Sequence, residues 1–157
     1  MHVLITGMSG AGKSSLVLEL RKRGYVAYDA DDDGFSEPRQ NGRWGWRAEQ
    51  VAELLARSQG QLLFFAGCSE EQAELPFDYR VLLTAPEAVL IKRLRARTSN
   101  AYGADDQQLS QVLSDLAEIE PLIRRSADLV LPTTELIARV ADDLLRRIGD
   151  LHHLDEK

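Results

Sequence analysis

Cysteine is almost absent from this sequence, which has only Cys68 among its 157 residues. A single cysteine excludes a disulfide framework and a zinc site built from several cysteines. It fits a reducing cytoplasm, where we expect the protein to be found. Long apolar runs are missing too, because the one in "MHVLITGMSG" is short and breaks at glycine. We therefore expect neither a signal peptide nor a membrane-spanning helix.

Basic residues are outnumbered: there are 19 Lys and Arg against 25 Asp and Glu, for a formal net charge of −6. A protein that holds long nucleic acid normally needs a basic face, so we expect no such partner. One phosphorylated small molecule is not excluded, because a few clustered arginines suffice to bind it. With 44% hydrophobic and 28% charged residues, the composition is that of a globular protein with a substantial core.

Short β-prone runs alternate with amphipathic helical segments along the chain. The pattern predicts strands at 3–6, 25–28, 61–67, 79–85 and 127–133, helices at 13–23, 47–58, 86–97, 109–123 and 135–148, and an irregular loop at 35–46. This alternation predicts an α/β fold of βαβ units around a parallel sheet, with helices on both faces. No linker is evident, so we expect one domain over residues 1–150 and a frayed tail at 151–157.

The segment "GMSGAGKS", at residues 7–14, follows the first predicted strand and opens the first predicted helix. It satisfies the phosphate-binding pattern G-x-x-x-x-G-K-[ST] in full. The glycines let backbone N–H groups turn towards phosphate oxygens, and the helix adds its positive N-terminal end. Lys13 is expected to reach the β- and γ-phosphates, and the Ser14 hydroxyl to bind Mg²⁺. The predicted nucleotide-binding residues of this segment are Gly7, Ser9, Gly10, Ala11, Gly12, Lys13, Ser14 and Ser15.

Signatures of other nucleotide-binding classes are missing. The sequence lacks the N-K-x-D motif that reads guanine, and the D-x-x-G motif of GTPases does not follow the third strand. That strand ends instead in Gly67, Cys68 and Ser69, without the carboxylate that a mechanical ATPase uses there to hold Mg²⁺ and position water. These absences favour an enzyme that takes its carboxylates from elsewhere.

Four aspartates are concentrated in "DADDDG", directly after the second predicted strand. The pattern resembles the start of an EF-hand calcium loop. A loop starting at Asp29 would need a glutamate at its twelfth position, which is Gln40. The strand-like "YVAY" before it and "NGRWGW" after it also replace the two flanking helices. Calcium is thereby disfavoured, which leaves a solvated turn or carboxylates that serve a reaction.

With its phosphate-binding loop and these aspartates, the chain resembles the P-loop kinases of small metabolites and nucleotides. That group contains shikimate kinase, gluconate kinase, dephospho-coenzyme A kinase and adenylate kinase. The resemblance implies a three-layer P-loop NTPase fold with a five-stranded parallel sheet of order 2-3-1-4-5. It also implies ATP and Mg²⁺ as cofactors.

In those kinases, one carboxylate after the second strand helps to hold Mg²⁺ and another contacts the acceptor hydroxyl as a base. The resemblance places Asp29 at the metal and Asp31 at the acceptor, although the two assignments can be reversed. Residues two apart on a strand face the same side, which supports pairing them. Asp32 and Asp33 have no counterpart in the family pattern, and we expect them in a solvated loop that turns at Gly34.

A second point of resemblance is "IKRLRARTSNAYG", where a helix ends in two arginines and a polar loop follows. Arg93 and Arg97 are four apart and share one helix face. The resemblance assigns Arg93 to the nucleotide base and Arg97 to its phosphates, where Arg97 would act catalytically together with Lys13. It implies a short lid at about 98–106 that closes over the substrate. The alternative is an ordinary basic helix end.

The acceptor half of the resemblance is less specific, because the D-G-F-P-R motif of adenylate kinase and the triple glycine of shikimate kinase are both absent. An acceptor loop is expected at about 33–47, where arginines can grip an anion and tryptophans can line a wall or pack the loop on the core. The candidate acceptor residues are Asp31, Arg39, Arg43, Trp44, Trp46, Arg47 and Gly67.

Together these features predict an ATP- and Mg²⁺-dependent phosphotransferase acting on a metabolite hydroxyl, a nucleoside or a nucleotide. One alternative is a nucleotide-binding regulatory ATPase without a small-molecule acceptor. Another is a polynucleotide 5′-end kinase, which the acidic net charge disfavours.

Overall fold

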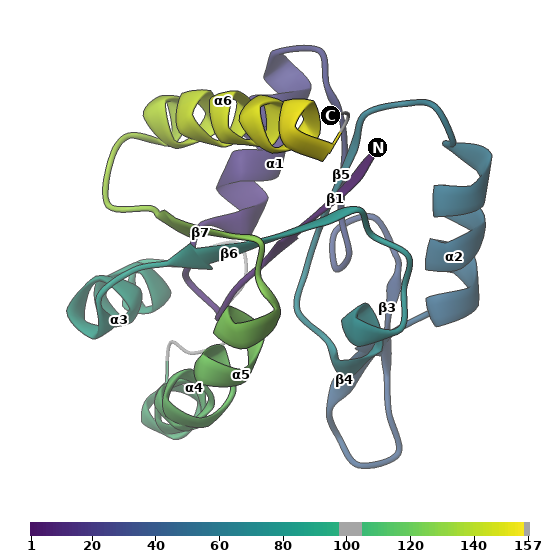
Figure 1. The fold of residues 1–157 in the computed structure, drawn as a ribbon. Coiled ribbons are helices and arrows are strands. Elements are labelled where there is room, and N and C mark those ends of the chain that lie inside the picture. The colour runs from purple at the N-terminus through teal and green to yellow at the C-terminus, as the bar shows by residue number, and fades with distance from the viewer. Residues whose placement is uncertain (98–104, 156–157) are drawn as a thin grey trace.

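A computed structural model describes residues 1–97 and 105–155 of the protein. At its centre is a parallel sheet of five strands: β1 (His2–Thr6), β2 (Val26–Asp29), β5 (Leu63–Ala66), β6 (Tyr79–Thr84) and β7 (Leu129–Pro132). The strands lie side by side in the order β2-β5-β1-β6-β7 (Figure 1). Counted within this sheet alone, that is the predicted order 2-3-1-4-5.

Helices cover both faces of the sheet, as the alternating pattern predicted. They are α1 (Lys13–Lys22), α2 (Ala48–Arg57), α3 (Glu87–Arg95), α4 (Asp106–Glu118), α5 (Glu120–Ser126) and α6 (Ile137–Asp155), with a short 3₁₀ helix η1 (Glu70–Ala73) after β5. Figure 1 shows α1 and α6 together on one face, with α2 and α5 on the other.

Side-chain alternation along the strands divides the core between these two faces. Val3 and Ile5 of β1 pack in the cluster that includes α1 and α6, whereas Leu4 packs in the cluster that includes α2. All three are fully buried. Strands buried on both faces explain the nearly continuous apolar runs of the sequence. The carboxyl ends of these parallel strands meet at one edge of the sheet, which is where ligands bind in such folds.

Two local predictions are wrong. Residues 35–46 are not an irregular loop, because β3 (Ser36–Pro38) and β4 (Trp44–Trp46) pair as an antiparallel hairpin. The single helix expected at 109–123 is two helices, α4 and α5, and Pro121 lies in the first turn of α5, which a proline tolerates. Helix α6 continues into the tail as far as Asp155.

Candidate active site

The phosphate-binding loop connects β1 to α1 at the carboxyl edge of the sheet. Gly7 has a φ of 153°, and a Cβ at this position would lie 2.7 Å from the carbonyl oxygen of Leu83. A side chain therefore cannot be accommodated where the loop leaves β1. Helix α1 begins at Lys13 with neither a side-chain cap nor an acidic residue in its first turn. Its N-terminal end is thus left to an external anion.

Backbone donors converge on this loop. Within the described part of the chain, the N–H groups of Ser9, Gly10, Gly12 and Lys13 donate to no backbone carbonyl, whereas Ala11 N–H donates to Met8 O at 3.1 Å. Unpaired N–H groups at the start of a helix are the donors that bind phosphate oxygens. The loop thus has the donors of a phosphate cradle.

Lys13 lies at the centre of the charged groups of the site. Its ammonium donates to Gly7 O at 2.6 Å and to Met8 O at 3.1 Å. Burial lowers the pKa of Lys13, electrostatic interactions with Cys68, Asp31 and Asp29 raise it, and the charge of Arg97 lowers it further. The predicted catalytic residues Lys13, Asp31 and Arg97 are therefore close enough to interact electrostatically, although their sequence positions span the first two thirds of the chain.

Asp29 and Ser14 form a pair of oxygen ligands beside the loop. Ser14 Oγ donates to Asp29 Oδ2 at 2.6 Å, and the Asp29 side chain is buried at the end of β2. The other carboxylate oxygen, Oδ1, accepts the backbone N–H groups of Asp31 and Asp32 at 3.0 and 3.2 Å, which fixes its orientation. A hydroxyl and a carboxylate in contact fit the preference of Mg²⁺ for oxygen ligands.

Asp29 and Asp31 were paired because residues two apart on a strand face the same side, and this reason is wrong. Strand β2 ends at Asp29, and residues 30–33 form a turn in which Asp33 N–H donates to Asp29 O at 2.9 Å. Asp31 is exposed and accepts from Ser36 Oγ at 2.6 Å. The turn, and not strand alternation, separates a buried carboxylate from an exposed one.

The two remaining aspartates of the turn differ from each other. Asp33 is not merely solvated, since its Oδ2 accepts from Arg21 at 2.5 Å and from the N–H of Asp29 at 2.7 Å. Asp32 remains exposed, as expected. The negative charge of Asp29, together with partial burial and the charges of Asp31 and Asp33, raises the pKa of Asp32.

Arg93 joins the phosphate-binding loop to the segment after β7. Its guanidinium donates to Gly10 O at 3.1 Å, to Thr133 Oγ1 at 3.1 Å and to Thr133 O. Thr133 is buried, and its hydroxyl lies 2.7 Å from Ala11 O and 3.2 Å from Thr84 O. Thr133 was not among the predicted site residues. The predicted lid at 98–106 lies mostly outside the described residues, which resume at Asp105.

The β3–β4 hairpin is tied to η1 by an ion-pair network centred on Arg39. Arg39 donates to Glu71 at 2.5 Å, to Glu37 at 2.7 Å and to Trp46 O at 2.6 Å. A Cβ at Gly45 would collide with Arg39 Nε, so a side chain there would displace the guanidinium. Three of the hydrogen bonds that this predicted acceptor residue can donate are thus made within the protein.

The other predicted acceptor residues lie at different depths. Trp46 is 2% exposed and packs edge-on against Phe65, with its ring against Gly67, whereas Trp44 is 67% exposed. Arg43 is exposed beside the hairpin turn, and Arg47 lies 3.8 Å from Glu37. Of the two tryptophans, Trp46 therefore docks the hairpin onto the core, and Trp44 is the one that solvent or a ligand can reach.

Comparison with known proteins agrees with this geometry. The family model described as "AAA domain" matches residues 3–114, which include the phosphate-binding loop, the aspartate turn, Arg93 and Arg97. The chain belongs to this family of AAA domains. No curated protein matches it at a significant level.

Solved structures share the fold of this AAA domain at low sequence identity. A shikimate kinase from Acinetobacter baumannii in complex with shikimate superposes with a TM-score of 0.70 at 18% identity, covering 95% of this chain and 93% of that one. A sugar kinase from Janibacter sp. HTCC2649 gives 0.65 at 18% identity, covering 94% of each chain. A gluconokinase from Sinorhizobium meliloti 1021 gives 0.61 at 18%, covering 99% and 97%. The AAA domain thus has the predicted P-loop kinase fold.

Two features of the site were not predicted. Cys68 showed no functional signal in the sequence, yet its exposed side chain is the first of the electrostatic interactions that raise the pKa of Lys13. Glu71 joins the hairpin to η1, because its carboxylate accepts from Arg39, from Ser69 and from the N–H of Trp46. Its partners lie 2, 25 and 32 positions away, so no local pattern identifies it.

Glu71 is expected to stabilise the AAA domain in a pH-dependent way. Burial raises its pKa, but the hydrogen bonds from Ser69, its own backbone, Trp46 and Arg39 outweigh burial and lower the pKa from 4.5 to about 2. Because the folded pKa is depressed, this contribution is complete above pH 4.5 and is lost as the pH falls towards 2. Glu71→Gln should reduce the free energy of unfolding at pH 7 by about 1 kcal/mol, since the pair is partly exposed.

The measurement is urea unfolding of the wild type and Glu71→Gln at several pH values, with Glu70→Gln, an exposed neighbour, as the control. The deficit of Glu71→Gln should shrink between pH 4.5 and 2, while the control stays near the wild type. An equal deficit at pH 7 and pH 2.5 would show that the carboxylate charge does not stabilise the hairpin.

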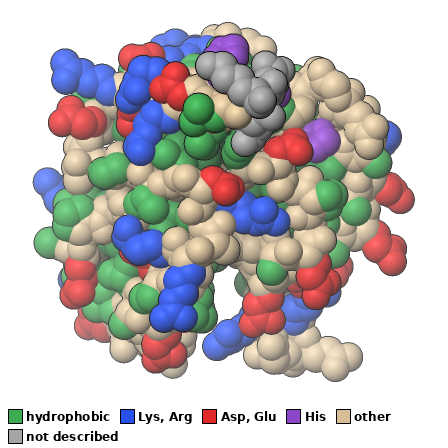
Figure 2. Space-filling model, in the orientation of Figure 1, with side chains coloured by type: hydrophobic (Ala, Val, Ile, Leu, Met, Phe, Trp, Pro, Cys, Tyr) green, Lys and Arg blue, Asp and Glu red, His purple; other side chains and the backbone are tan. Residues whose placement is uncertain are grey.

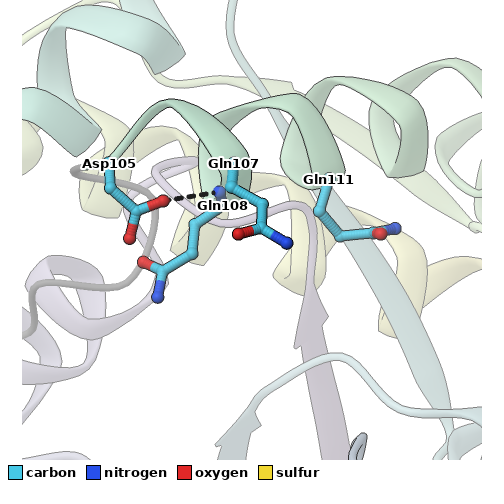
Figure 3. A pocket seen from close by; sticks show the side chains of 4 residues that line it. All are labelled: Asp105, Gln107, Gln108 and Gln111. Carbon is cyan, nitrogen blue, oxygen red and sulfur yellow. Dashed lines mark hydrogen bonds between the residues drawn. The ribbon is translucent and has the colours of Figure 1, made fainter.

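A surface hollow of about 370 Å³ lies along the first turns of α4, away from this network. Figure 3 shows its lining of Asp105, Gln107, Gln108 and Gln111, with Asp105 accepting the N–H of Gln108 at 2.8 Å as the helix cap. These side chains come from a single helix end and bring no basic group, so the hollow adds nothing to the phosphate site.

In the part of the chain that the structure describes, no helix is long and apolar enough to cross a membrane.

Proposed function

We propose that the protein is an ATP- and Mg²⁺-dependent kinase that transfers the γ-phosphoryl group to a hydroxyl of a small-molecule acceptor. The observation that carries the proposal is the set of charges around Lys13. A phosphate-loop lysine that interacts with two carboxylates and an arginine at the carboxyl edge of the sheet has the groups that phosphoryl transfer needs. The reducing cytoplasm is the proposed compartment.

The nucleotide half of the reaction uses the loop between β1 and α1. Its unpaired N–H groups hold the phosphates, and Lys13 and Arg97 neutralise charge on the phosphoryl group in transfer. Arg93, between the loop and Thr133, is placed to line the base pocket. Ser14 and Asp29 would hold Mg²⁺, which supplies further neutralisation of phosphate charge when it is bound.

The division of labour between the aspartates follows from their burial. Asp29 is buried against Ser14, so it is the metal-side carboxylate of the proposal. Asp31 is exposed, interacts with the charge of Lys13, and retains one carboxylate oxygen that Ser36 does not use. In the proposed step, Asp31 takes the proton of the acceptor hydroxyl while the acceptor oxygen forms its bond to the γ-phosphorus and the bond from that phosphorus to ADP breaks.

The test is a screen of candidate acceptors by thermal shift with a non-hydrolysable ATP analogue and Mg²⁺ present, because ligands of the native state raise its melting temperature. Each hit is then incubated with ATP and Mg²⁺, and mass spectrometry should detect the addition of one phosphoryl group. If the hits bind but none is phosphorylated, the site is regulatory and the kinase proposal fails.

A further inference from the structure

A second hollow, of about 200 Å³, lies on the α2 and α5 face of the sheet. It is lined by Gln72 and Ala73 of η1, Arg80 of β6 and Ser126 at the end of α5. Figure 2 shows a gap in the surface in the lower middle of the view, between the parts that Figure 1 draws as the β3–β4 hairpin and as α4 and α5. None of these four residues is used in the proposed nucleotide site.

Among the described residues, no carboxylate lies within ion-pair distance of the Arg80 guanidinium, although Asp128 Oδ2 accepts the backbone N–H of Arg80 at 2.7 Å. Its guanidinium donates to Phe77 O at 3.4 Å and to Leu75 O at 3.2 Å, both of which are long and neutral contacts. Among the described residues, three half-buried arginines lack a carboxylate within ion-pair distance: Arg80, Arg93 and Arg97. The last two are assigned to the proposed nucleotide site, Arg97 at its phosphates and Arg93 at its base. Arg80 is left without a counterion.

The other arginines near the acceptor site are already compensated or lie at the surface. Arg39 is paired with Glu37 and Glu71, and Arg47 lies beside Glu37. Two of the three arginines predicted to grip an acceptor anion are therefore engaged by glutamates of the same hairpin and of η1. An anionic group entering between η1 and α5 would meet Arg80 instead.

The hollow is connected to the phosphate-binding loop through Gln72. Gln72 Oε1 accepts from the hydroxyl of Thr6 at 3.0 Å, and Thr6 is the residue before Gly7. Arg80 pairs with Leu4 in the sheet and Leu82 pairs with Thr6, so Arg80 lies two residues further from the loop. A molecule anchored at Arg80 would therefore extend towards the γ-phosphate with its other end.

We propose that this hollow is the distal part of the acceptor site and binds an anionic group, a carboxylate or a phosphate, of a small hydroxyl-bearing acceptor. Arg80 supplies the charge, and the Gln72 amide and the Ser126 hydroxyl supply polar contacts around it. A volume of about 200 Å³ has room for about seven water-sized groups, which suits a small acid and not a nucleotide. The assignment of this anion site to the acceptor rests on the proposed kinase function.

Binding is measured by calorimetry on the full chain without ATP, with gluconate against gluconamide and glycerol 3-phosphate against glycerol. The wild type should bind the anionic member of at least one pair about tenfold more tightly than the neutral member. The pair that shows the preference identifies the carboxylate or the phosphate. Arg80→Gln should bring that ratio to about one, and Arg80→Lys should retain part of it.

Arg57→Gln, at an exposed arginine at the end of α2, is the control and should keep the wild-type ratio. No preference for the anion in either wild-type pair, or a preference that survives in Arg80→Gln, overturns the proposal. The ratio of anionic to neutral binding in the wild type tests the proposed anion site even if Arg80→Gln does not fold. This experiment measures binding and not phosphoryl transfer. An absent anion preference would therefore refute this anion site and leave the proposed kinase function intact.

Discussion

Replacing Lys13 by methionine is expected to lower phosphoryl transfer about a thousandfold while leaving the protein folded. The ammonium is the positive group that the loop brings to the phosphates, and removal of one such group from a transition state costs about 10²–10³ in rate. Burial lowers the pKa of Lys13, which means that desolvation of this charge destabilises the folded protein when no nucleotide is bound. Methionine removes that cost, so the melting temperature without nucleotide should be unchanged or higher.

The measurements are the initial rate of product formation and thermal unfolding without nucleotide. Lys22→Met, which changes an exposed lysine at the end of the same helix, should affect neither. A Lys13→Met protein that retains transfer at more than a tenth of the wild-type rate would remove Lys13 from the proposed chemistry. A large loss of stability would show instead that its bonds to Gly7 and Met8 hold the loop.

Asp31→Asn is expected to lower kcat by about 10²–10⁴, the range of general-base catalysis, with little change in ATP affinity. Asparagine keeps the shape and can still accept the Ser36 hydrogen bond, but it cannot take a proton. Asp29→Asn should act differently, by raising the Mg²⁺ concentration needed for activity, because Asp29 lies against Ser14.

Asp32→Asn is the matched control, since Asp32 is an exposed carboxylate in the same turn. It should keep kcat within a few-fold of the wild type. If Asp32→Asn loses as much as Asp31→Asn, the turn contributes only its net negative charge and no single residue acts as the base. If Asp29→Asn alone abolishes kcat at saturating Mg²⁺, the two roles are reversed.

The phosphate-binding loop could be located from the sequence because its signals are local. The phosphate-binding pattern fits within eight consecutive residues, and the adjoining strand and helix could be recognised from their own periodicity. The strand order came from the family resemblance, and the sheet confirms it. Arg93 lies in α3 as expected, but the predicted helix to residue 97 is too long, because α3 ends at Arg95 and Arg97 lies two residues beyond it.

The hairpin was not predictable in this way, because long-range pairs hold it. Nothing in "FSEPRQNGRWGW" indicates that Arg39 pairs with Glu71, 32 residues later. Nor does it indicate that the Arg39 guanidinium lies against the backbone of Gly45. Arg39 therefore looked like an acceptor ligand, although three of the hydrogen bonds that it can donate are made within the protein. Arg80 was missed for the opposite reason: inside an apolar strand it carries no motif, and only the missing counterion distinguishes it.

The most direct test of the central claim follows the γ-phosphorus of ATP by ³¹P NMR in a reaction with Mg²⁺, the wild-type protein and a pool of small hydroxy acids and polyols. The γ-phosphoryl signal of ATP should be replaced by the signal of a new phosphomonoester, with equimolar ADP. Neither Lys13→Met nor Asp31→Asn should show this change at comparable enzyme concentration. If the wild type releases only inorganic phosphate, or binds ATP without consuming it, the protein is not a small-molecule kinase.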